Sequence, residues 1–443
     1  MNIMNKKISK ILVAIVLLLL FLVESQSVLS QYSISNPYSK YGLGFEQTSI
    51  NQTSASMGGV GYAFARNNEV NILNPASYSA IEKQSFVFSM GFDFSWKTLS
   101  NNNNSSDAFF GSISNISLAF PILDRLKAGL SLMPLTDINY NASDTVLSFV
   151  NHVKTYQGNG GVNKFTFGLS YDILKTAKTN LSIGANATYY FGNIYRATSI
   201  DFLTQADSNG KYYDTIGFLD NTTETNYNVS SFGFDFGLLY RQKLNNEDVI
   251  SLGVAFTPSV RLRADRTQIF YTYYSYAAQK YLQDTLSYTK DKTKIKVPMK
   301  IGCGLSYEKP DKIFVEADFT FTKWSDFDMD LQSNAEMKDN LTFNMGAEYI
   351  PNIFSTLYYN KMAYRLGFHY DNGYIFLQDN RITEFGISFG VALPIKKLGT
   401  KVNLGAEYGK RGTTNNNLIR ESYFRIGLSF SAKDRWFVKR KYQ

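Results

Sequence analysis

The sequence predicts an all-β fold, namely a fourteen-stranded antiparallel transmembrane β-barrel with an N-terminal luminal plug (hatch). Three observations lead to this prediction: segments of alternating apolar and polar residues, connections that alternate between short and long, and many aromatic residues without long apolar runs. Because side chains alternate between the two faces of a strand, such segments present one apolar face and one polar face. A tilted strand of about ten residues crosses the ~30 Å hydrocarbon core of a bilayer.

The clearest alternation lies in residues 294–323, which predict one hairpin of the barrel. In the first arm one parity carries Ile295, Val297, Met299, Ile301, Cys303, Leu305 and Tyr307. The other parity carries lysine, glycine and serine, and the second arm repeats the pattern after a short polar turn at 308–311. We expect the apolar parity to face lipid and the polar parity to face the lumen.

Composition narrows the class of protein. Charged residues are 19% of the 443 residues, below the ~25% typical of soluble domains, whereas aromatic residues reach 15%, which suits the aromatic girdles of a barrel. A secreted β-rich protein is the alternative on composition alone. The net charge of +8 is scattered without a nucleic-acid motif, which indicates solvated loops, lumen charges and attraction to anionic lipid. The single cysteine, Cys303, excludes an internal disulfide and a cysteine-cluster metal site, and no cofactor or metal is predicted.

The chain order predicts four regions. Residues 1–30 are expected to be a signal peptide, because Lys6, Lys7 and Lys10 precede an apolar run at 11–23 that is too short to span a bilayer. Residues 31–83 lack sustained alternation and are the predicted plug, residues 84–430 the barrel, and residues 431–443 a basic periplasmic tail. The expected setting is the outer membrane of a Gram-negative bacterium.

Fourteen alternating segments are counted from residue 84 onward. They lie at 86–96, 116–120, 126–132, 165–171, 181–191, 232–240, 250–256, 294–307 and 312–323, and around Phe343, Leu366, Phe389, Leu404 and Ile426. Short links at 121–124, 172–179, 242–248, 308–311 and 394–400 alternate with long polar links at 99–111, 141–162, 196–226 and 264–293. Short periplasmic turns and long outer loops are typical of outer-membrane barrels.

Two motifs precede the first strand. Met57, Gly58, Gly59 and Gly61 form a glycine-rich segment, and Asn74, Pro75 and Ala76 follow it. Each could be an ordinary turn, but together they resemble the hatch of the FadL-like family of long-chain fatty-acid channels. That family is fourteen-stranded, in agreement with the count.

The resemblance implies passive transport of hydrophobic small molecules across the outer membrane. An alternative comes from relatives that bind proteins, such as the shuttle component of the type IX secretion system. On this alternative the chain is an accessory barrel subunit of a secretion or barrel-assembly complex. The expected partners are outer-membrane lipid, a hydrophobic small molecule or other outer-membrane proteins, and no nucleic acid.

The lumen parity carries glycine in twelve strands: Gly91, Gly129, Gly168, Gly184, Gly233, Gly253, Gly302, Gly346, Gly367, Gly386, Gly405 and Gly427. These glycines would either admit the backbone of the plug or ease curvature. The candidate lumen charges are Lys296, Lys300, Glu316, Asp318, Glu348, Arg365, His369, Glu384 and Arg425, and they are expected to pair with one another or with the plug. Pro134 interrupts the third strand, where the family resemblance implies a lateral opening and a simple bulge is the alternative.

No enzymatic activity is predicted. The segment 386–390 matches the nucleophile-elbow pattern of serine hydrolases, but it lies within an alternating strand, whereas an elbow needs a strand, a turn and a helix. A further candidate site is an aromatic stretch in the link at 264–293. Its residues Phe270, Tyr271, Tyr273, Tyr274 and Tyr276 are candidate contacts for a partner, and an aromatic girdle with strand extension is the alternative.

Overall fold

The computed structural model describes residues 36–47, 51–146, 151–202, 205–206, 212–213, 219–244, 247–276, 279–329, 335–395 and 399–435. The predicted signal peptide at 1–30 lies outside the described residues, as do residues 31–35 of the predicted plug and 436–443 of the predicted tail.

One closed antiparallel barrel with fourteen strand positions forms the fold, which confirms the prediction. The ring closes where β22 (Arg420–Arg435) pairs with the whole of β2 (Ser85–Ser100). Between them the wall is built in chain order by β3 (Ser105–Pro121), β4 (Leu126–Val146), β5 (His152–Lys175), β6 (Thr179–Phe202), β9 (Asp220–Lys243), β10 (Val249–Thr257) with β11 (Val260–Tyr276), β12 (Gln279–Val297) with β13 (Lys300–Lys309), β14 (Ile313–Thr322), β16 (Asn340–Tyr349), β17 (Ala363–Asp371), β20 (Glu384–Pro394) and β21 (Lys401–Arg411). Every predicted segment overlaps one of these strand positions, although 294–307 is interrupted at 298–299 between β12 and β13 and 312–323 is one residue longer than β14 at each end. β22 extends past the predicted barrel boundary at residue 430.

Several short elements accompany the wall. They are η2 (Pro37–Lys40), β1 (Phe45–Glu46), α2 (Gln52–Ala55), η3 (Pro75–Ala80), β7 (Gln205–Ala206), β8 (Tyr212–Tyr213), η4 (Trp324–Asp326), β15 (Glu336–Met337), η5 (Tyr358–Lys361), β18 (Ile375–Leu377), β19 (Asn380–Arg381) and η6 (Asn415–Asn417). The first four precede the barrel in sequence.

The outer surface of the wall carries large exposed apolar side chains. Phe232 is 67% exposed, Phe319 57% and Phe389 58%, and Cys303 is also exposed on this surface. A continuous band of this kind matches the lipid-facing belt of an outer-membrane barrel. Among the residues that the structure describes, no helix is long and apolar enough to cross a membrane.

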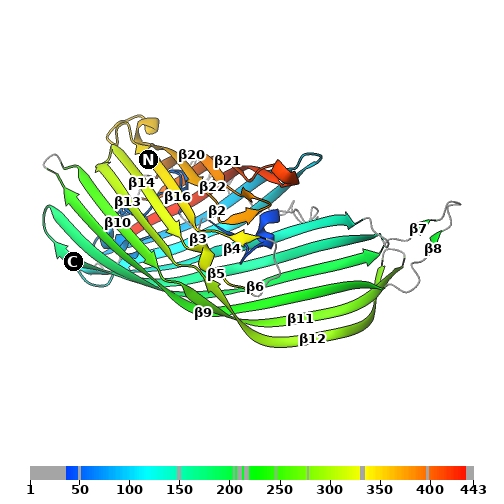
Figure 1. Ribbon diagram of the computed structural model, residues 1–443. Coiled ribbons are helices and arrows are strands. Elements are labelled where there is room, and N and C mark those ends of the chain that lie inside the picture. Colours follow the sequence, from blue (N-terminus) through cyan, green and yellow to red (C-terminus); the bar gives the residue numbers. More distant parts are fainter. Residues whose placement is uncertain are drawn as a thin grey trace, which may run out of the picture. The chain divides into compact units, whose positions relative to one another are not determined.

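The four predicted long links are mostly strand, so the prediction of long loops is wrong at these places. β4 and β5 remain paired from the wall to Val146↔His152, and β11 and β12 remain paired to Tyr276↔Gln279. Figure 1 shows β5, β6, β9, β11 and β12 running well beyond the ends of β14 and β16. Apolar alternation marks only the part of a strand that faces lipid, whereas backbone pairing continues into water.

Beyond the closed ring these strands form an open sheet, here called the extension sheet. It consists of residues 134–146 of β4, 152–162 of β5, 192–202 of β6, 220–229 of β9, and all of β11 and β12. One edge is β4, because β3 pairs with β4 only from Ile116↔Leu132 to Pro121↔Lys127. The other edge is β12, which among the described residues pairs only with β11, apart from one bridge between Lys296 and Asp328.

Two prolines invert the faces of two neighbouring strands. Pro258 separates β10 from β11 and Pro298 separates β12 from β13, while the register stays the same from Thr257↔Lys300 to Val260↔Val297. On the β10 side of the break the even-numbered residues Leu252 and Phe256 are exposed, whereas on the β11 side the even-numbered Leu262 is fully buried. Since proline cannot donate a ladder hydrogen bond, the chain turns over there and the alternation shifts by one residue.

Because of this inversion, the predicted orientation of side chains is wrong for part of the hairpin at 294–323. Ile295 and Val297 do not face lipid, because Ile295 is fully buried in an interior cluster with Leu262 and Val297 packs against that cluster. Lys296, predicted to face the lumen, lies on the opposite face of β12 from Ile295, with its Nζ 3.7 Å from Asp326. Lys300 lies beyond Pro298 and contacts Glu46 of β1.

Cysteine labelling tests the inversion. In a Cys303→Ser background, Lys294→Cys is expected to react rapidly with a polar maleimide and Ile295→Cys slowly, because Lys294 is exposed and Ile295 is buried. Mass spectrometry of the folded protein measures the two rates. Faster labelling at position 295 than at 294 would contradict the inverted faces.

Candidate functional site

The candidate site is the N-terminal segment, residues 36–47 and 51–84, where it packs against the inner wall of the barrel. Nine of the twelve predicted lumen glycines lie against this segment, because an added Cβ would meet its atoms: Gly129, Gly168, Gly184, Gly253, Gly302, Gly346, Gly367, Gly405 and Gly427. The other three, Gly91, Gly233 and Gly386, face side chains of the barrel itself. Contact with this segment therefore accounts for most of these glycines: its backbone lies against Gly184, Gly253, Gly346 and Gly367, and its side chains lie against the other five.

The glycine-rich motif is bound through its backbone. The N–H of Gly58 donates to Ser388 Oγ at 2.9 Å, within the serine-hydrolase-like pattern, which lies inside β20. The N–H groups of Gly61 and Tyr62 both donate to Asp318 Oδ2, at 2.7 and 3.1 Å. Gly58 has φ +72° and lies against the backbone of β17, so a side chain there would be both strained and obstructed.

A second carboxylate extends this contact. Glu316 Oε1 accepts the N–H of Ala63 at 2.7 Å, and both Glu316 and Asp318 are completely buried. Hydrogen bonds to a carboxylate are shorter and stronger than neutral ones. The two acidic residues, which were expected to pair with other charges or with the plug, thus bind consecutive backbone N–H groups of the N-terminal segment.

The Asn-Pro-Ala motif forms a second attachment. Asn74 caps η3 by accepting the N–H of Ala76 at 3.0 Å, and Pro75 occupies the start of the helix, where its missing N–H costs nothing. The Asn74 amide donates to the carbonyl of Tyr62 at 2.7 Å and to the carbonyl of Leu238 in β9 at 3.1 Å. One asparagine therefore joins both motifs to the wall.

Ion pairs complete the attachment. Arg66 Nη1 lies 2.6 Å from Glu348 Oε1, and Arg365 Nε lies 2.7 Å from the other oxygen of Glu348. Glu69 lies 3.8 Å from both Arg365 and Lys401. Glu348 and Arg365 were predicted lumen charges, whereas Arg66 and Glu69 were not predicted. Charged residues within an otherwise apolar, glycine-rich segment are nevertheless a recognisable signal for buried ion pairs.

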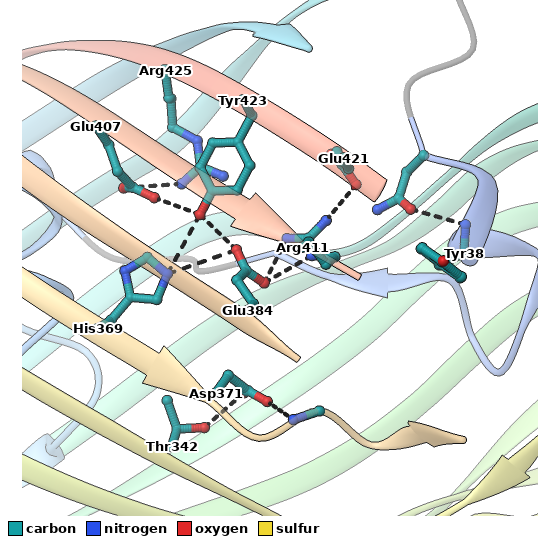
Figure 2. Close-up of polar contacts among 12 residues, drawn as sticks. Tyr38, Thr342, His369, Asp371, Glu384, Glu407, Arg411, Glu421, Tyr423 and Arg425 are labelled. Atoms are coloured by element: carbon teal, nitrogen blue, oxygen red, sulfur yellow. Dashed lines mark hydrogen bonds and ion pairs between the residues drawn. The ribbon is translucent and has the colours of Figure 1, made fainter. Parts of the chain in front are cut away.

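A charged network occupies the inner face of β17, β20, β21 and β22 (Figure 2). The Tyr423 hydroxyl lies 2.7 Å from Glu384 and 3.0 Å from Glu407, and it can donate its single hydrogen to either carboxylate. Glu384 also lies 2.8 Å from Arg411 and 3.7 Å from His369. Three predicted lumen charges, His369, Glu384 and Arg425, thus meet in one network, in which Arg411 and Tyr423 were not anticipated.

A cavity of about 110 Å³ separates this network from the N-terminal segment. Its lining includes the polar and charged side chains of Gln52, Asp93, His369, Glu407 and Arg425, together with alanines and glycines. Within the described part of the chain, no group of three or more His, Cys, Asp or Glu side chains has a metal-binding arrangement. The cavity suits water and polar groups better than an alkyl chain.

The pairing of β3 with β4 stops just before Pro134. The ladder between β3 and β4 ends at Ile116↔Leu132, and the register of β4 with β5 shifts between Pro134 and Thr136. A cavity of about 310 Å³ adjoins this break and is lined by Pro134, Thr136, Asn163 and Phe110, among others. β1 pairs with Thr136 and Asp137 next to it.

The aromatic stretch belongs to β11 and is not a free loop. Tyr271 donates to Glu224 at 2.8 Å, and Tyr273 donates to Asp201 at 2.5 Å and is 1% exposed. Phe270 is partly buried, and the side chains of Tyr274 and Tyr276 lie outside the described residues. The structure therefore places Tyr271 and Tyr273 in cross-strand contacts of the extension sheet.

Replacing Asp318 by leucine tests the attachment of the N-terminal segment. The variant loses the acceptor of two backbone N–H groups, each bond to a charged group being worth about 1.5–3 kcal/mol. Limited proteolysis followed by mass spectrometry is expected to show faster cleavage within residues 51–84 while the barrel strands stay resistant. Asp144→Leu, at an exposed carboxylate of β4, is the control. Equal cleavage in both variants would contradict a stabilising role of Asp318.

Three solved outer-membrane channels share the fold at low sequence identity. The toluene transporter TbuX of Ralstonia pickettii is 16% identical (TM-score 0.55; 87% of this chain, 98% of that chain). A FadL homologue of Pseudomonas aeruginosa is 14% identical (TM-score 0.57; 88% and 99%). The toluene transporter TodX of Pseudomonas putida is 15% identical (TM-score 0.54; 90% and 100%). The predicted resemblance to FadL-like outer-membrane barrels is thus confirmed for the fold.

Comparison of the sequence with models of known protein families assigns the chain to one of them. No curated protein sequence matches the chain. A family model described as BamG matches residues 4–443, almost the whole length, and the chain therefore belongs to the BamG family.

Proposed function

We propose that this protein is an accessory barrel of an outer-membrane assembly complex, in which it binds other proteins and does not conduct a solute. The observation that carries the proposal is the attachment of the N-terminal segment inside the barrel by charged and polar groups. In this proposal residues 1–30 are removed as a signal peptide, residues 31–83 act as a permanent plug, and the mature chain resides in the outer membrane.

The attachment opposes displacement by a hydrophobic ligand. Asp318, Glu316 and Ser388 accept four backbone N–H groups from residues 58–63, and Glu348 binds Arg66. A hydrocarbon has no group that can replace these bonds, so moving the segment would leave buried carboxylates without donors. A plug of this kind is better suited to stabilise a barrel than to open for an apolar solute.

The extension sheet supplies the surface for partners. It continues beyond the closed ring and ends in the open edge strand β12. An open edge can pair with a strand of another protein. The name of the BamG family also hints at a role in barrel assembly.

A second candidate function is lateral passage of hydrophobic small molecules. The end of the β3–β4 ladder and the cavity beside Pro134 favour it, as does the similarity of the fold to the toluene transporters TbuX and TodX. In this alternative the ligand would enter through the lumen and leave between β3 and β4. The polar cavity beside the network of β17, β20, β21 and β22 opposes a wholly apolar path.

Purification in mild detergent tests the proposed function. We expect outer-membrane proteins to co-purify in stoichiometric amounts, and we expect a shortened β11–β12 hairpin to lose them. Replacing 266–291 by Asn-Gly leaves the paired residues Asp265 and Lys292 on either side of a two-residue turn. Replacing 101–104 by Asn-Gly shortens the β2–β3 hairpin in the same way and is the control. A barrel that purifies alone, with bound fatty acid in place of protein, would refute the proposal.

Ligand binding separates the two candidate functions. Under the proposed function the purified barrel is expected to show no saturable binding of a radiolabelled fatty acid. Ser112→Trp would fill the cavity beside Pro134, whereas Ser105→Trp lies on β3 outside its lining. Saturable binding that falls about tenfold or more in the first variant, a loss of about 1.4 kcal/mol, and not in the second would establish the transport function.

A further inference from the structure

A group of basic side chains covers one part of the outer surface of β11 and β12. Arg261, Arg263, Lys290, Lys292 and Lys294 are all exposed and lie on the face that became outward after the proline break. These five residues are here called the basic patch. Among the described residues no carboxylate lies within ion-pair distance of any of them.

The basic patch places like charges directly opposite each other. Arg263 pairs across the ladder with Lys294, and Arg261 pairs with Lys296. Opposed like charges destabilise a sheet. Only the next pair, Asp265↔Lys292, combines opposite charges, whereas Asp291 is bound by Arg266 through two hydrogen bonds of 2.9 and 2.5 Å. An anion from outside the chain would relieve this repulsion.

Protection of an open edge does not explain the whole patch. Lysines on an edge strand discourage non-specific aggregation through that edge without excluding a partner of matching charge, and this accounts for the lysines of β12. Arg261 and Arg263, however, lie on β11 and not on the edge strand β12; they pair with β12, and β11 pairs with β9 from Ala264 onward. The planar guanidinium of arginine can bind a phosphate through two parallel N–H groups. A residue that only repels other chains needs a positive charge but not this geometry.

The patch lies just above the apolar belt. On the same hairpin Leu252, Phe256 and Ile301 are exposed below the prolines, and Phe232 of the adjacent β9 is the most exposed of these side chains. Arg261 and Arg263 follow the end of β10 by four and six residues. With ~3.4 Å per residue and a tilt of about 40°, they lie roughly 10–15 Å beyond the end of β10, on the water side of the apolar belt.

We propose that the basic patch binds the phosphate groups of an anionic lipid in the outer leaflet, with the acyl chains against the apolar belt below. The proposal rests on the outer-membrane location and not on the assembly role. Continuity with the belt favours a lipid over an acidic protein, because one lipid molecule can fill both surfaces at once. The bound lipid would fix the depth of the extension sheet above the membrane.

Native mass spectrometry of the full-length protein in detergent tests this proposal. The probes are diphosphoryl lipid A, phosphatidylcholine and inorganic phosphate. The patch variant is Arg261→Gln/Arg263→Gln/Lys294→Gln. The control variant, Lys178→Gln/Lys309→Gln/Lys312→Gln, removes the same charge from exposed lysines in the turns at the other end of the wall. A second patch variant, Lys290→Gln/Lys292→Gln/Lys294→Gln, applies if the first does not fold.

We expect lipid A to bind the native protein and the control alike, and to bind the patch variant about 100-fold more weakly, since each of the three basic residues near an anionic surface contributes about a factor of five. Equal binding of lipid A to the patch and control variants would overturn the proposal. It would also fail if phosphatidylcholine bound as well as lipid A, or if inorganic phosphate alone displaced the lipid. Loss of an acidic protein partner from the patch variant, with lipid binding unchanged, would assign the patch to that protein instead.

Discussion

Two buried carboxylates form the interaction on which the rest of the molecule depends. Glu316 and Asp318 lie two residues apart on the same face of β14, both without solvent exposure. Two like charges so close together in the interior are costly unless donors surround them. The N–H groups of residues 61–63 donate to one oxygen of each carboxylate, so the wall and the N-terminal segment stabilise each other.

The glycines of the wall provide the space that this interaction requires. Gly253 and Gly302 lie against Tyr62, and Gly346 and Gly367 lie against Met57 and its neighbour. Side chains at these positions would keep the segment too far from Asp318 for a hydrogen bond. The polar lumen is therefore specialised for one internal partner, which agrees with a barrel that acts through its outer surfaces.

The sequence predicted the fold well because membrane strands obey a strict rule. Lipid on one side and a polar lumen on the other impose a period of two, and that period located all fourteen strands. The rule failed at Pro258 and Pro298, where the chain turns over and carries Ile295 inward. It also failed beyond the bilayer, where β11 and β12 pair in water without apolar alternation.

The candidate site was predictable in outline only. The two motifs located the contact segment, and parity located Glu316 and Asp318, but their partners are backbone groups, which no residue pattern reveals. Pro258 and Pro298 lie at matching positions of two neighbouring strands, and they were a visible sign in the sequence that the faces invert there. Arg66 and Glu69 gave a similar indication, because a charged side chain within a buried segment needs an oppositely charged partner nearby.

The glycine-lined inner wall also has a consequence for biogenesis. β22, the last strand of the chain, seals the cylinder against β2, and nine inner glycines are covered only by a segment that precedes β2 in sequence. A cylinder sealed without that segment would enclose an unfilled hollow and unsatisfied acids. We therefore expect β2 and β22 to pair only after the N-terminal segment has packed inside, so that the closed barrel does not form with an empty lumen.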